Sequence, residues 1–381
     1  MLEIPLSGIK KIEEIAQSSS EYISLSQGSI KVGGIPQQVK GYVQELLNSD
    51  KTDYYESCWG LKVLREKIAT TLSARHGVHI NINQVLPTHG CIGGLSLLYL
   101  TLLNPGDEVI IPEPAYPAYN ILAQASRCEV KYVSCLVPGT LSSWVLDVDA
   151  IKQAITPKTK MIVFSNPSNP TGNIIPPATL EALITLCDSR GIYLVIDEAY
   201  REYVFDGDYT SAITLLHKSP FVISANSFSK SMAMSGWRVG YLLVHEQLTR
   251  PLAGMQDALL NCLNNTAQYA AMYALDHPTL TTEMYTKVLH NRDYALNRLK
   301  PLLDAGIFSV QKPSGGFFLF LRTQFADGTD LCMDILNSAK VGLIPGKTFG
   351  PSAAPFIRLC YARDPEILEE GIDRLVKYFI K

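Results

Sequence analysis

Residues 227–241 read Ser-Phe-Ser-Lys-Ser-Met-Ala-Met-Ser-Gly-Trp-Arg-Val-Gly-Tyr. Lys230 stands among hydroxyl side chains after an apolar run, and Arg238 lies eight residues downstream between two glycines. Apolar surroundings disfavour the charged form of a lysine, so its amine can become nucleophilic. Hydroxyls and an arginine suit a phosphate. The stretch therefore predicts an aldehyde cofactor with a phosphate, held on Lys230 as a Schiff base; an exposed lysine in a polar turn is the alternative.

Upstream and downstream of this stretch, predicted strands alternate with predicted helices. Helices are expected over 61–75 and 91–103, and strands over 85–88, 108–112, 130–133, 160–164, 193–196, 220–223 and 239–243. This alternation predicts an α/β fold with a mainly parallel sheet flanked by helices. Polar residues follow several of these strands, and the carboxyl ends of the strands are where such sheets bind ligands.

A second set of elements follows residue 245. Helical patterns dominate there, including one at 281–303, and strands are expected at 308–310, 316–321 and 356–361 before a last helix at 365–378. These elements predict a smaller α+β domain, to which the N-terminal segment returns. In that segment a short strand is expected over 22–28. The expected division is an N-terminal arm with part of the small domain at 1–45, a large cofactor-binding domain at 46–280, and a C-terminal small domain at 281–381.

Composition excludes several classes of function. The 381 residues carry 33 basic and 36 acidic side chains, a formal net charge of −3, which gives no electrostatic case for nucleic acid or a membrane as a partner. No leader or membrane span is recognisable in the sequence, so a cytoplasmic location is expected. The eight cysteines form no Cys-x-x-Cys pair and the seven histidines show no ligand spacing, so we expect reduced thiols and no metal site.

A glycine turn at Gly90 opens the helix expected over 91–103. The first free N–H groups of that helix, at Gly90, Cys91 and Ile92, could hold an anion. The spacing of the glycines matches neither of the common nucleotide-binding fingerprints.

Three motifs occur in order along the chain: Asn-Pro-Ser-Asn-Pro-Thr-Gly at 166–172, Asp-Glu-Ala-Tyr at 197–200, and Ser-Phe-Ser-Lys-x₇-Arg-x-Gly-Tyr at 227–241. The set resembles the class I and II aminotransferases, the fold-type I enzymes that depend on pyridoxal 5'-phosphate. The resemblance extends from Leu25 to the C-terminal helix. It implies an aminotransferase that moves an amino group between an L-amino acid and a 2-oxo acid, in ping-pong half-reactions, through a pyridoxal-phosphate aldimine on Lys230.

The resemblance also implies roles for four catalytic residues. Lys230 would carry the cofactor and, once freed, move a proton from the substrate α-carbon. Asp197 would pair with the pyridine nitrogen, although a helix cap after a strand is the structural alternative. Asn169 and Tyr200 would donate to the phenolic oxygen of the cofactor, although Asn169 could also serve simple turn chemistry.

Further cofactor contacts follow from the same resemblance. Tyr116 would stack on the pyridine ring, whereas Tyr119 is expected only to pack in the core. Tyr55 would reach the phosphate of the neighbouring subunit, which implies a homodimer. The remaining phosphate contacts would come from Ser227, Ser229, Arg238 and the helix start at Gly90, Cys91 and Ile92.

Substrate contacts are implied at Arg358, which would clamp the α-carboxylate as a planar bidentate donor, and at Gly28, Asn169 and Phe318. Residues 251–280 contain no arginine. The classical dicarboxylate enzymes place an arginine for the distal carboxylate there, so the sequence argues against their arrangement. Asn264 lies near that register, and Lys31 could supply a positive charge instead.

Two alternatives remain open at this stage. A pyridoxal-phosphate β-lyase of the C–S lyase type could use the same residues, since elimination and transfer share their first steps. A catalytically idle, ligand-sensing homologue is the other alternative. Such proteins usually carry a DNA-binding extension, for which the sequence offers no spare segment.

Overall fold

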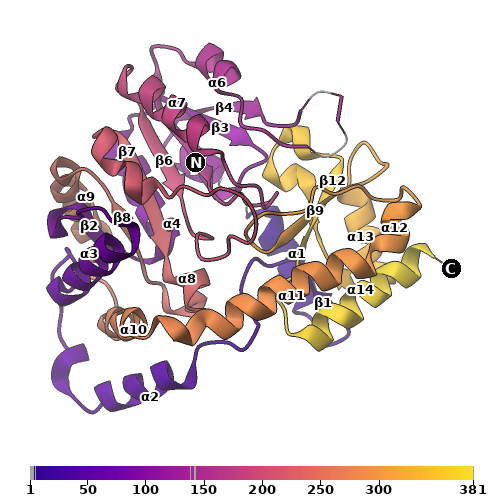
Figure 1. Cartoon of the computed structure of the whole chain (residues 1–381), viewed down its shortest axis with the longest axis horizontal. Helices are drawn as coiled ribbons and strands as arrows, with labels where there is room; N and C mark the ends of the chain where they lie inside the picture. Colours follow the sequence, from indigo (N-terminus) through magenta and orange to yellow (C-terminus); the bar gives the residue numbers. More distant parts are fainter. Residues whose placement is uncertain (1–3, 5, 138, 141–142, 381) are drawn as a thin grey trace.

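The largest sheet has seven strands in the order β2-β8-β7-β6-β5-β3-β4 (Figure 1). The computed structural model describes residues 4, 6–137, 139–140 and 143–380. Only β8 runs antiparallel to its neighbours, β2 and β7, which confirms the predicted α/β fold with a mainly parallel sheet. The strands are β2 (Val85–Thr88), β3 (Glu108–Glu113), β4 (Glu129–Ser134), β5 (Thr159–Ser165), β6 (Tyr193–Asp197), β7 (Val222–Ser227) and β8 (Gly240–Leu243).

Both faces of this sheet are covered by helices. In β5, Ile162 and Phe164 join one apolar cluster while Met161 and Val163 join another, because successive side chains of a strand point to opposite faces. Each cluster is completed by helices, so the strands read as nearly continuous apolar runs. The helices are α3 (Lys62–His76), α4 (Gly90–Leu102), α5 (Ala118–Ala125), α6 (Val148–Ala154), α7 (Pro177–Asp188), α9 (Glu246–Leu260) and α10 (Asn265–Asp276).

A second apolar core joins the N-terminal and C-terminal segments. β1 (Ile23–Ser24) pairs in parallel with β10 (Val341–Gly342), and Leu25 shares a buried cluster with residues of the last helix, α14 (Pro365–Phe379). A three-stranded antiparallel sheet forms beside them from β11 (Ile344–Pro345), β12 (Phe356–Cys360) and β9 (Phe318–Arg322). The remaining α-helices of the described residues are α1 (Gly8–Ala16), α2 (Gln37–Leu46), α8 (Phe228–Ser231), α11 (Thr282–Arg298), α12 (Lys300–Asp304) and α13 (Thr329–Ser338).

Three elements differ from expectation. The predicted strand at 308–310 is reduced to a single bridge between Ser309 and Arg322. The helix predicted at 281–303 is two helices, α11 and α12, because Pro301 at the start of α12 has no N–H with which to continue the first one. The early strand expected around 22–28 is only the two residues of β1. Residues 1–3 and 5 of the expected arm lie outside the described residues.

Candidate active site

The candidate site lies at the carboxyl ends of β5, β6 and β7. Asp197 is the last residue of β6 and pairs in register with Ser165, the last residue of β5. β7 ends at Ser227, and the short helix α8 (Phe228–Ser231) that follows carries Lys230. The sheet topology thus brings residues from all three sequence motifs to one edge, as predicted for a parallel sheet.

Asp197 is a buried carboxylate held by neutral donors. Its Oδ2 accepts from the Tyr119 hydroxyl at 2.9 Å, and its Oδ1 accepts from the Ala199 N–H at 3.0 Å and the Cys91 thiol at 3.4 Å. Burial raises the pKa of Asp197, and the three donors oppose that rise. The side chain also caps the turn at Ala199, so the capping alternative and a functional role coexist in one residue.

The amine of Lys230 points toward the N-terminal segment. Its Nζ donates to the carbonyl oxygen of Gly28, while the Tyr203 hydroxyl donates to its backbone carbonyl at 3.1 Å. The pKa of Lys230 is lowered to about 8; burial is the largest cause, and the positive charges of Arg238 and Arg358 contribute to the same shift. About one fifth of this amine is therefore neutral at pH 7.4, far more than for a lysine with the ordinary pKa.

Arg358 in β12 is only 1% exposed. Its Nη1 donates to Oδ1 of Asn169 at 2.9 Å, its Nη2 donates to the carbonyl oxygen of Ser26, and its guanidinium lies 4.2 Å from the ring centre of Phe318. Burial lowers its pKa to about 10. Among the described residues, Nε of Arg358 has no hydrogen-bond partner. A buried N–H without a partner fits an anionic ligand that accepts from this arginine.

Asn169 and Tyr200 lie together beside Arg358. The Asn169 amide donates to the Tyr200 hydroxyl at 3.4 Å, and the ring of Tyr200 meets those of Phe317 and Phe318 edge-on. Burial is the main reason why the pKa of Tyr200 lies well above its ordinary value, so the phenol keeps its proton and can donate.

The start of α4 and Arg238 form a candidate phosphate cradle. Gly90 has a φ of +69°, and a Cβ at this residue would lie 2.6 Å from Nη2 of Arg238. Arg238 also reaches Oγ of Ser229 at 3.5 Å, and Oγ of Ser227 accepts the Ser229 N–H at 3.0 Å. The free N–H groups of a helix start, an adjacent guanidinium and two hydroxyls are a donor set that fits a phosphate.

Tyr119 corrects one expectation. It was expected to pack only in the core, yet its hydroxyl is bonded to Asp197. The ring of Tyr116 meets that of Tyr119 edge-on, with centroids 5.7 Å apart. The signal that could have found Tyr119 is its position three residues after Tyr116, one turn along the start of α5 (Ala118–Ala125).

Three predicted residues contact none of these side chains in the described part of the chain. Tyr55 is 83% exposed. Lys31 is exposed, with its backbone N–H bonded to the carbonyl oxygen of Ala362 at 3.1 Å. Asn264 caps α10 by accepting the N–H of Ala267. Of the other predicted residues, Gly28 and Phe318 contact Lys230 and Arg358, and Cys91 donates to Asp197. Ser227, Ser229 and Arg238 form the cradle beside Gly90.

The donor set of the whole site fits pyridoxal phosphate. The cradle offers hydrogen-bond donors for its phosphate, and the lowered pKa of Lys230 makes the amine available to the aldehyde. The buried carboxylate of Asp197 can accept a hydrogen bond from a protonated ring nitrogen. No group of three His, Cys, Asp or Glu side chains within the described residues could hold a metal ion. No helix in that part of the chain is long and apolar enough to span a membrane.

Comparison with known proteins identifies the family. The family described as "Aminotransferase class I and II" matches residues 20–375. A probable N-acetyl-LL-diaminopimelate aminotransferase of Bacillus subtilis is 30% identical over 100% of this chain and 94% of the relative. An aspartate aminotransferase structure from Thermotoga maritima superposes with a TM-score of 0.89, at 28% identity, over 99% of this chain and 98% of the other. An alanine aminotransferase structure from Pyrococcus furiosus superposes with a TM-score of 0.90, at 27% identity, over 100% of this chain and 98% of the other. The chain therefore belongs to the class I and II aminotransferases and is an enzyme that depends on pyridoxal phosphate.

Proposed function

We propose that the enzyme moves an amino group between an L-amino acid and a 2-oxo acid in two successive half-reactions at one site. One observation carries the proposal: the buried amine of Lys230 lies close enough to the carboxylate of Asp197 and the guanidinium of Arg358 for both charges to act on its pKa, and Nε of Arg358 has no partner within the described residues. Nζ of Lys230 donates to the carbonyl oxygen of Gly28, and Arg358 donates to the carbonyl oxygen of Ser26, two residues earlier in the chain. Arg358 also donates to Asn169.

The residues divide the work of holding the cofactor. Bound pyridoxal phosphate supplies an aldehyde carbon for the substrate nitrogen and a ring that accepts electrons from the substrate α-carbon. The phosphate would be held by Arg238, the hydroxyls of Ser227 and Ser229, and the N–H groups at the start of α4, from Gly90 to Ile92. Asp197 would accept a hydrogen bond from the protonated ring nitrogen, and Tyr116 would cover one face of the ring.

Lys230 would move the proton. Because its pKa is lowered to about 8, Nζ is available as a neutral base near physiological pH. Nζ would take the proton from the substrate α-carbon and hold it until it is returned. Tyr200 and Asn169 would donate to the ring oxygen of the cofactor from the opposite end of the same network.

Arg358 would bind and orient the amino acid. Its guanidinium is already fixed by Asn169, Ser26 and the Phe318 ring, so little side-chain freedom remains to be lost on binding. A carboxylate at Nε and one Nη would be held by two parallel hydrogen bonds, which sets the direction of the α-carbon. Gly28 and Phe318 would border the same substrate.

A homodimer is part of the proposal. Tyr55 and Tyr54 are 83% and 74% exposed, which leaves two neighbouring aromatic rings in water. A second subunit would cover them, and Tyr55 would then reach the partner's phosphate cradle. A cytoplasmic location completes the proposal.

The experiment is a transfer assay with a covalent test of the site. The purified enzyme should convert a 2-oxo acid to its amino acid when supplied with a donor, in a panel of donors against 2-oxoglutarate and pyruvate. Borohydride should attach the cofactor to Lys230, as read by peptide mass spectrometry. Covalent attachment in Lys230→Ala would contradict the assignment.

Product analysis separates transfer from the alternatives. Release of ammonia and pyruvate from a β-substituted amino acid, without exchange of keto acids, would replace transfer by elimination.

A further inference from the structure

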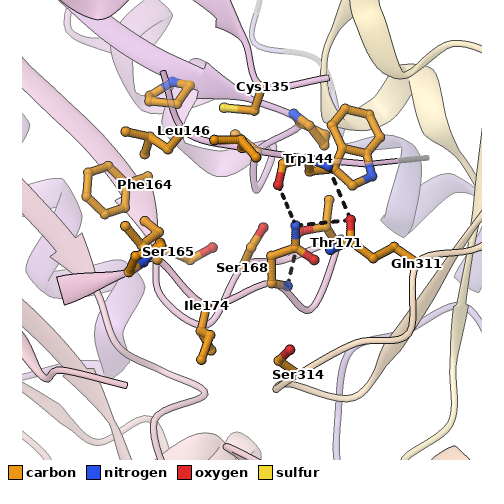
Figure 2. Close-up of a pocket in the computed structure, with 17 residues that line it drawn as sticks. Cys135, Trp144, Leu146, Phe164, Ser165, Ser168, Thr171, Ile174, Gln311 and Ser314 are labelled. Atoms are coloured by element: carbon orange, nitrogen blue, oxygen red, sulfur yellow. Dashed lines mark hydrogen bonds between the residues drawn. The ribbon is translucent and has the colours of Figure 1, made fainter. Parts of the chain in front are cut away.

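A cavity borders the loop that carries Asn169, with Ser168 and Thr171 of that loop in its wall. Its volume is about 180 Å³, and it is lined by 17 residues (Figure 2). Its walls come from the end of β5, at Phe164 and Ser165, from Trp144, and from Gln311 and Ser314 in the segment that leads into β9. Figure 2 shows Trp144 and Gln311 on one side, with Phe164 and Leu146 across the cavity from Gln311.

This cavity is distinct from the proposed cofactor site. Lys230, Asp197, Asn169 and Arg358 are absent from its lining. The lining contains no Asp, Glu, Lys, Arg or His, and burial raises the pKa of Cys135 to about 12, so that this thiol also stays neutral. The cavity is partly open to solvent at the exposed Val145 and Gln311. An ion that entered would lose part of its hydration without gaining a countercharge, so the cavity suits a neutral molecule.

One acceptor in the lining is unsatisfied. The Nδ2 of Asn173 is 3.0 Å from the carbonyl oxygen of Trp144 and 3.5 Å from Oε1 of Gln311. A carbonyl oxygen can only accept, so this contact fixes which end of the Asn173 amide is nitrogen. Oδ1 of Asn173 is buried and has no hydrogen-bond partner within the described residues. A buried carbonyl without a donor is costly to leave unpaired.

We propose that this cavity is a binding site for a neutral, single-ring aromatic molecule that carries one hydrogen-bond donor, which is given to Oδ1 of Asn173. The size supports a single ring, because a cavity of about 150 Å³ is large enough for benzene. The apolar walls, which include Trp144, Phe164, Leu146 and Ile174, supply contact surface for the ring. Phenol is the simplest probe with this chemistry.

The site is linked to the proposed catalytic residues by one short contact. Oγ of Ser165, in the cavity wall, accepts the backbone N–H of Asn169 at 2.9 Å. Asn169 in turn accepts from Arg358. A ring bound against Ser165 would therefore contact the loop that carries Asn169, which is bonded to Arg358. Its binding should change KM for the amino acid.

Calorimetry on the holoenzyme with three probes tests the proposal. Phenol and toluene have similar size, but only phenol can donate to Asn173, so phenol should bind about tenfold more tightly. Benzoate should not bind in this cavity, because its charge finds no partner there. Equal affinity for phenol and toluene would overturn the proposal without any variant, as would benzoate binding that persists in Arg358→Lys and is lost in Ile174→Phe.

Two substitutions locate the binding. Asn173→Leu keeps the size of the side chain but removes the acceptor, so phenol should lose its advantage over toluene. Ile174→Phe fills the cavity, so both probes should be lost while transfer activity without probe is retained. If phenol still binds to Ile174→Phe, it binds elsewhere on the protein, and the proposed site is refuted. An unchanged KM at saturating phenol would refute only the link through Ser165.

Discussion

The Tyr119 hydroxyl donates a 2.9 Å hydrogen bond to Oδ2 of the buried carboxylate of Asp197. Tyr119→Phe removes the donor without changing the ring, so the pKa of Asp197 should rise further and the carboxylate should hold a ring-nitrogen proton less well. A hydrogen bond to a charged group contributes about 1.5–3 kcal/mol, so we expect a 10- to 100-fold loss of cofactor affinity. Titration of the cofactor-free protein with pyridoxal phosphate measures it.

Tyr99→Phe is the matched control. Tyr99 lies on α4, is fully buried, and its hydroxyl has no partner within the described residues. Removal of that hydroxyl should leave cofactor affinity unchanged. Equal losses in the two variants would show that the Tyr119 effect comes from packing and not from Asp197.

Arg358→Lys tests the carboxylate clamp. Lysine keeps the charge but lacks the planar fork, and it cannot make the present bonds to Asn169 and Ser26 together with two to a substrate. Loss of one charged hydrogen bond should lower kcat/KM about 10- to 100-fold, mainly through KM. Cofactor absorbance should persist. The control is Arg374→Lys, at a surface ion pair with Glu370, which should change neither kcat/KM nor the cofactor absorbance. An unaltered KM in Arg358→Lys would rule out Arg358 as the residue that binds the substrate carboxylate.

Gly90→Ala tests the phosphate cradle. The new Cβ would lie 2.6 Å from Nη2 of Arg238, in a backbone with a φ of +69°. Gly77 at the end of α3 has a φ of +65° but no atom within 4 Å of the added Cβ. Both alanine variants should lose about 1 kcal/mol of stability from the left-handed backbone. Only Gly90→Ala should also lose affinity for pyridoxal phosphate, measured by titration; equal affinities would contradict the cradle.

Lys230 should leave a pH signature in the stability of the cofactor-free protein. Its pKa is lowered from 10.5 to about 8, so between these values the unfolded chain binds a proton that the folded protein does not. Stability therefore rises with pH across this window, and below pH 8 the cost of burying the ammonium is present in full. Lys230→Met should be more stable than wild type at pH 7, by a margin that shrinks toward pH 10.

Calorimetry of both proteins at pH 7, 8, 9 and 10 measures this margin. Lys40→Met, on the exposed surface of α2, serves as the control for the loss of one lysine charge outside the site. A constant margin for Lys230→Met would show that the amine titrates normally.

Sequence reasoning predicted the parts of the site that side-chain chemistry specifies. Lys230, Asp197 and Asn169 stand in motifs, and strand alternation brought them to one edge of a parallel sheet. Contacts made by backbone atoms were not predictable. The carbonyl oxygens of Ser26 and Gly28 accept from Arg358 and Lys230, and no side-chain pattern encodes such a contact.

Other parts need tertiary or quaternary structure. Tyr119 and Tyr116 are aromatic residues three positions apart in one short segment; this spacing marks Tyr119 as a candidate, but its hydrogen bond to Asp197 is seen only in the tertiary structure. The contact of Tyr55 with a neighbouring subunit needs that subunit, and it stays a prediction. The domain boundaries at 45 and 280 also stay predictions.

Substrate choice can be tested at Lys31. Its side chain is exposed in the glycine-rich segment that follows Gly28, while residues 251–280 offer no arginine for a distal carboxylate. If this segment moves over bound substrate, the Lys31 ammonium would favour acidic side chains. Lys31→Ala should then lower kcat/KM for glutamate about tenfold, the effect of one charged hydrogen bond, and leave alanine and methionine unchanged.

The control is Lys40→Ala, which removes an exposed lysine of the same net charge from α2. The three donors are compared in wild type and both variants at low and high salt, because an exposed charge acts less strongly when it is screened. An unchanged ranking of the donors in Lys31→Ala would exclude this lysine from side-chain selection. A ranking that changes in both variants would instead point to the overall field of the protein, since the two lysines share only their charge.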